Sequence, residues 1–85
     1  MNASMYYTKK AFLEEIQEAI PARREISVKE DEFSFDIDID VHIPAWNRAV
    51  QKAEAIRDKW VKEGYDVKIS TFDQLRNITF DLNYD

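Results

Sequence analysis

Apolar and polar residues alternate in two segments of this chain that nearly repeat each other. Residues 34–40 read Ser-Phe-Asp-Ile-Asp-Ile-Asp, and residues 79–85 read Thr-Phe-Asp-Leu-Asn-Tyr-Asp. Because successive side chains of a strand point to opposite faces, each segment predicts a half-buried strand with an apolar inner face and an acidic or polar outer face. We expect the first of these strands to run over residues 33–43, with every apolar side chain from Phe33 to Ile43 on the inner face.

Two other segments carry apolar residues at helical spacing. Residues 8–20 begin with a threonine that can cap a helix and are followed by a proline, and they have one apolar face. Residues 44–63 begin with a proline, end before a glycine and place Trp46 and Trp60 on their apolar face. The sequence therefore predicts two helices, with both tryptophans as core anchors and residues 1–7 as a flexible N-terminal segment.

Two shorter alternating segments complete the set of predicted elements. Residues 26–29 and 67–70 each alternate, and a polar turn joins each of them to one of the acidic strands, which predicts two hairpins. The order is α-β-β-α-β-β, the order of a ferredoxin-like sheet that is cut and rejoined at another loop. The sequence thus predicts a single α+β domain over residues 1–85, of permuted ferredoxin-like architecture. Its four-stranded antiparallel sheet has the strand order three-four-two-one and carries both helices on one face.

The charge of the chain is concentrated at the outer positions of the two acidic strands. The chain has 17 acidic and 12 basic residues, a formal net charge of -5. The outer positions hold five aspartates, Asp36, Asp38, Asp40, Asp81 and Asp85. Without these five, 12 acidic residues face 12 basic ones. Direct binding of nucleic acid through this face is disfavoured, because phosphate binding depends on lysine and arginine.

Composition narrows the chemistry further. The chain has no cysteine, which excludes disulfides and thiol catalysis and fits a cytoplasmic protein. The sequence has neither the basic-then-apolar start of an export signal nor a membrane-spanning run, so we expect no contact with a membrane. His42 is the single histidine and has no suitably placed nucleophile in the pattern. These observations predict a protein that is not an enzyme and needs no cofactor.

The acidic positions also argue against a metal site. Same-face neighbours on a strand are about 7 Å apart, too far for adjacent aspartates to share one ion without help from Asp81 on the next strand. Residues 66–68 have the acid-x-lysine pattern of some metal-dependent nucleases, but we expect Lys68 to lie across from Asp81 and partly neutralise it. A magnesium-dependent hydrolase is the least favoured functional class.

The leading hypothesis is a small acidic protein-binding module. Aspartate is a poor strand former, and solubility alone could be met by threonine or lysine, although a solvated face that discourages edge pairing is the plain alternative. A negative stripe can steer and hold a basic protein surface. We therefore expect a nucleic-acid mimic that occupies the basic groove of a nucleic-acid-handling protein, as a phage-type or immunity-type inhibitor would. The predicted partner-binding residues are Asp36, Asp38, Asp40, Asp81 and Asp85, with His42 and Asn83 at the edges.

A second hypothesis belongs to another functional class. An exposed sheet edge, or the tyrosine pair at residues 6–7, could instead join copies of the chain. The protein would then be an assembly subunit that forms a homo-oligomer.

Overall fold

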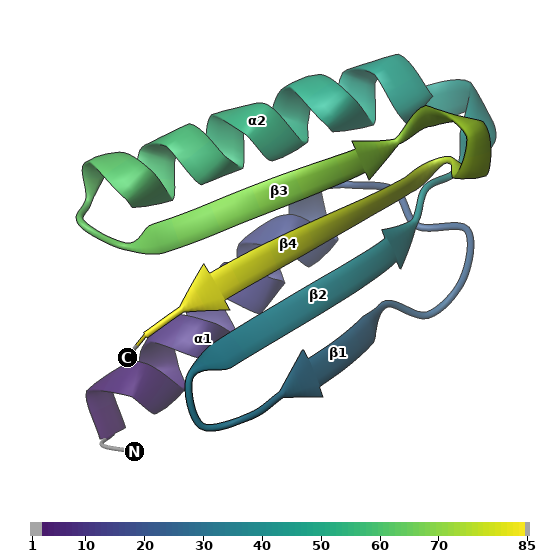
Figure 1. The fold of residues 1–85 in the computed structure, drawn as a ribbon. Coiled ribbons are helices and arrows are strands. Elements are labelled where there is room, and N and C mark those ends of the chain that lie inside the picture. Colours follow the sequence, from purple (N-terminus) through teal and green to yellow (C-terminus); the bar gives the residue numbers. More distant parts are fainter. Residues whose placement is uncertain (1–2, 85) are drawn as a thin grey trace.

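The computed structural model describes residues 3–84, with side chains from Met5 onward, so the prediction for Asp85 lies outside the described residues. Two 3-10 turns accompany the regular elements, η1 (Ile43–Ala45) before the second helix and η2 (Asp73–Leu75) between the last two strands. Along the chain of Figure 1, the helices and strands are α1 (Ala3–Ala19), β1 (Ser27–Glu30), β2 (Ser34–Asp40), α2 (Trp46–Lys62), β3 (Asp66–Phe72) and β4 (Asn77–Asn83).

The four strands form one antiparallel sheet in the order β1-β2-β4-β3, which confirms the predicted topology (Figure 1). The two acidic strands, β2 and β4, are the central neighbours, with Ile37 directly opposite Phe80. Both helices pack on the face that these apolar side chains form. The order of elements and the alternation of side chains therefore determine a two-layer α+β domain.

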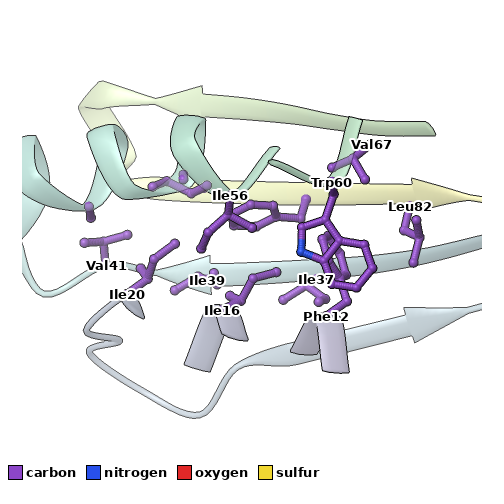
Figure 2. Close-up of a cluster of buried hydrophobic side chains, with 14 of the residues drawn as sticks. Phe12, Ile16, Ile20, Ile37, Ile39, Val41, Ile56, Trp60, Val67 and Leu82 are labelled. Atoms are coloured by element: carbon purple, nitrogen blue, oxygen red, sulfur yellow. The ribbon is translucent and has the colours of Figure 1, made fainter. Parts of the chain in front are cut away.

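The core lies between the helices and the sheet, and aromatic contacts mark its centre (Figure 2). The ring of Phe12 from α1 meets Trp60 of α2 edge-to-face at 5.0 Å and Phe80 of β4 at 5.9 Å. Trp46 and Trp60 are 8% and 7% exposed, so both predicted core anchors are confirmed. The indole nitrogen of Trp60 donates to the carboxylate of Glu15 at 2.9 Å, which satisfies the one polar atom of that ring.

The first helix begins earlier than the sequence predicted. It starts at Ala3 rather than at Thr8, so Tyr6 and Tyr7 are exposed residues of the helix. The segment from Ala3 to Thr8 contains neither proline nor glycine, so its backbone can be helical throughout. Among the described residues, neither helix combines the length and apolar character needed to cross a bilayer.

The long acidic strand is shorter than predicted at both ends. β2 covers Ser34–Asp40, and Phe33 and Ile43 are 57% and 51% exposed instead of lying in the core. At its start, the carboxylate of Asp31 accepts the backbone N–H groups of Phe33 and Ser34, which holds a turn and lowers the pKa of Asp31. At its end, Pro44 lies in the 3-10 turn that leads into α2. Local turn geometry at both ends thus overrides the alternation.

Replacing Ile37 by alanine should lower the free energy of unfolding by about 2–5 kcal/mol, because the side chain is fully buried and its removal leaves a cavity. Replacing Ile43 by alanine should change it by less than about 0.5 kcal/mol, because that side chain is already exposed. Urea unfolding of the two variants beside the parent protein measures both values. Equal losses at the two positions would place Ile43 in the core and contradict the observed strand end.

Candidate functional site

The face of the sheet away from the helices, here called the open face, carries the outward side chains of all four strands. Its residues follow from the register, because Phe35, Ile37 and Ile39 of β2 are buried toward the helices and their neighbours point the other way. Strand by strand, the open face consists of Ser27 and Lys29, then Ser34, Asp36, Asp38 and Asp40, then Asn77, Thr79, Asp81 and Asn83, then Asp66, Lys68, Ser70 and Phe72.

Two carboxylates lie directly opposite each other at the centre of this face. Asp36 of β2 pairs with Asp81 of β4 across the two central strands. One oxygen of each, Oδ1, is shielded from solvent and accepts no hydrogen bond within the described part of the chain. A hydrogen bond between the two carboxyl groups raises the pKa of Asp36 to about 6, with burial and the negative charge of Asp81 adding to the shift. The pair therefore holds a proton near pH 6 and carries two like charges at higher pH.

Lysines flank the carboxylate pair on the two edge strands. Lys29 of β1 lies opposite Asp36, and Lys68 of β3 lies opposite Asp81, as predicted for Lys68. Neither lysine forms an ion pair with these aspartates, so neutralisation across the row is partial. The row runs Lys-Asp-Asp-Lys across the sheet, with the negative charge on the two central strands.

The other two predicted aspartates have partners inside the fold. The side-chain amide of Asn77 donates to Asp38 at 2.5 Å and to Asp40 at 3.2 Å. Arg24 adds an ion pair to Asp40 at 3.0 Å. These donors stabilise the charges of Asp38 and Asp40, whereas no described residue donates a hydrogen bond to Oδ1 of Asp36 or Oδ1 of Asp81. Asp38 is nevertheless exposed and accessible to a partner.

The remaining predicted residues lie at the ends of the stripe. Asn83 ends β4 opposite Ser34 and donates to Asp81 at 3.4 Å. His42 is exposed but follows the strand at the start of the η1 turn, so its place is beyond the open face. Phe72, a half-exposed aromatic on β3, lies at the same end as Asn77. The structure thus brings together Asp36, Asp38, Asp40, Asp81 and Asn83, and leaves His42 aside.

Sequence reasoning missed Asn77, Lys29 and Arg24 as parts of this surface. The alternation that places Asp38 outward also places Lys29 and Asn77 outward, and that signal could have found them. Arg24 had no such signal. It reaches Asp40 because the loop after α1 forms a backbone bridge between Ala22 and Val41, a contact that only tertiary structure makes.

Within the described residues, no three histidine or carboxylate side chains come together in a group that could hold a metal ion. No protein-family model matches the chain. No curated protein matches it either.

Asp81→Asn should raise the free energy of unfolding at pH 8 by about 1 kcal/mol, because it removes a like-charge pair and offers Asp36 a donor. The gain should shrink at pH 5. There the parent pair holds a proton, because the folded pKa of Asp36, about 6, exceeds its ordinary value of 3.8. Between pH 3.8 and about 6, the folded parent binds more protons than the unfolded chain. The stability that comes from protonating the pair is therefore fully present below pH 3.8 and is lost as the pH rises through about 6. Urea unfolding at both pH values checks this.

Glu54→Gln is the matched control, because it removes one exposed carboxylate from α2 and should change stability little at either pH. Asp38→Asn is a second comparison on the open face. Asp38→Asn should raise the free energy of unfolding at pH 8 by less than Asp81→Asn does, since Asp38 already accepts a hydrogen bond from Asn77. An Asp81→Asn variant that is less stable than the parent at pH 8, or a gain of the same size at pH 5, would rule out repulsion within the pair.

Proposed function

We propose that this protein is a small binding module whose open face docks on a basic surface of another protein. The observation that carries the proposal is the Asp36–Asp81 pair, in which two carboxylates lie directly opposite each other and Oδ1 of each is shielded without a hydrogen-bond partner among the described residues. Like charges directly opposite each other cost a sheet up to about 1 kcal/mol. The guanidinium or ammonium group of a partner placed over the pair would remove this repulsion, so docking would recover stability that the isolated fold lacks.

The shape of the negative stripe supports a groove as the partner surface. Its charge lies on two central strands about 5 Å apart and extends along a seven-residue strand, roughly 20 Å in length. Lys29 and Lys68 bound the stripe on both sides and would repel basic groups placed over the edge strands. The complementary surface is therefore a long, narrow basic groove. Grooves of this kind bind nucleic-acid backbones, and we propose that the carboxylates of the open face stand in for phosphates there.

One observation favours self-assembly as the second candidate function. β3 is an edge strand of seven residues, and its outer side has no strand neighbour in the described sheet. Such an edge can pair with the same strand of another copy. Lys68 on this strand works against that pairing, because it would bring like charges close together. Docking through the open face therefore stands first.

A photo-crosslinking residue at Ser70, an exposed position on the open face, should form an adduct with another protein in an extract of the source cells. Mass spectrometry should identify that protein as one with a nucleic-acid-binding groove, and added duplex DNA or RNA should compete the adduct away. The double variant Asp36→Asn/Asp81→Asn should reduce its yield about tenfold or more, since charged partners in an interface contribute several kcal/mol.

The matched control is Glu54→Gln/Glu63→Gln, which removes the same charge from the exposed surface around α2 and should leave the adduct unchanged. A crosslinker at Gln51 on α2 should give no such adduct. An adduct with twice the mass of the chain would support self-assembly instead. An adduct that survives Asp36→Asn/Asp81→Asn, or that nucleic acid does not displace, would overturn the proposal.

A further inference from the structure

The helices leave one edge of the sheet uncovered on their own side. All four residues of β1 are exposed, including Val28, which points toward the helix layer opposite Ile37 but is 43% exposed. A cavity of about 320 Å³ lies where α1 passes the β1–β2 hairpin. It is lined by Tyr6, Lys9, Lys10, Leu13, Glu30 and Phe35. This cavity is on the opposite side of the sheet from the open face, so an inference from it does not depend on the proposed docking function.

A buried lysine forms one wall of the cavity. Lys9 is only 5% exposed, and its ammonium group forms an ion pair with Glu30 of β1. The same ammonium lies 5.7 Å from the ring centre of Phe35 and 5.1 Å from that of Tyr84, within the range of cation–π attraction. Lys9 is therefore held in place by three neighbours, and its charge is balanced by Glu30 within the wall.

The charge that remains in the lining belongs to Lys10. Lys10 follows Lys9 on α1, is exposed, and has no ion pair with any described residue. Lys9 and Glu30 neutralise each other, so the lining has a net charge of one positive unit at the solvent side. A ligand that complements this cavity carries a single negative charge at the end that faces Lys10.

The rest of the lining is apolar. Of the apolar and aromatic residues that line it, Phe35 is buried, Leu13 is half-buried and Tyr6 is 55% exposed. The volume is at the lower end of the range for small-molecule sites. The matching ligand is thus a short apolar chain or single ring that ends in an anion.

We propose that this cavity is a binding site for small amphipathic monocarboxylates. The apolar part of the ligand lies against Leu13 and Phe35 under the ring of Tyr6, and its carboxylate accepts from the ammonium group of Lys10 at the rim. The ammonium group of Lys9 binds the carboxylate of Glu30 in the wall of the cavity. It thereby keeps that carboxylate turned away from the carboxylate of the ligand.

Octanoate is the probe, with octanol as its neutral match and octylamine as its cationic match. In an NMR titration at pH 7, octanoate should shift amide signals of α1 and the β1–β2 hairpin saturably, with a Kd in the millimolar range or below. Octanol should bind the same residues about three- to fivefold more weakly, the effect of one exposed charge pair. Octylamine should bind more weakly than octanol. Lys10→Gln should reduce the affinity for octanoate to that for octanol and leave octanol unchanged.

Two further variants separate the site from general surface binding. Lys52→Gln removes an exposed lysine from α2 and should leave all three affinities unchanged. Tyr6→Ser should weaken octanoate and octanol alike, since it removes part of the apolar lining without touching the core. The proposal is overturned if octanoate causes no saturable shift at millimolar concentration, or if the shifts lie at the exposed Phe72 and Leu75 end. Equal binding of octanoate and octanol with no effect of Lys10→Gln would also overturn it.

Discussion

The antiparallel register between β2 and β4 is the constraint on which the rest of this structure depends. It places Ile37 against Phe80 under the helices, where both side chains are fully buried. Because the pleat has a period of two, the same register places Asp36 against Asp81 on the other face. A shift of either strand by one residue would turn its apolar side chains toward solvent, so a one-residue slip cannot separate the carboxylates. The buried face thus enforces the repulsion on the open face.

On the open face, hydrogen-bond donors to the aspartates of β2 and β4 are unevenly placed along these two strands. At one end Asn77 donates to both Asp38 and Asp40, and Arg24 reaches Asp40 from the loop after α1. At the centre, the pair of Asp36 and Asp81 can satisfy its shielded oxygens only by sharing a proton. At neutral pH the middle of the two central strands therefore holds two adjacent carboxylates that no ion pair with a described residue neutralises. This is the part of the surface on which a basic partner has most to gain.

The two sides of the sheet differ in whether their charged side chains are paired with opposite charges. On the open face, the strand register holds like charges together, whereas on the helix side Lys9, the one ammonium group buried among the described residues, is paired with Glu30. Lys9 occupies the position in α1 that continues the stripe of Phe12 and Ile16, where a core hydrophobe would be expected. Its aliphatic stem packs at the edge of the core, and its ammonium group meets Glu30 just where the helix layer ends short of β1. The cavity beside it exists because two helices cannot cover all four strands.

Periodicity in the sequence by itself determined the elements, their order, the inward face of each strand and both tryptophan anchors. It also indicated the strand order, because two hairpins that share a helix layer have few ways to pair. Tertiary structure alone decided where strands end, as the exposure of Phe33 and Ile43 shows. It also decided that Asp36 meets Asp81, that Asn77 supports the neighbouring aspartates, and that Lys9 is buried. The reason is that a repeat of two or 3.6 residues specifies which way a side chain points, whereas its partner depends on register, turns and coverage by distant elements.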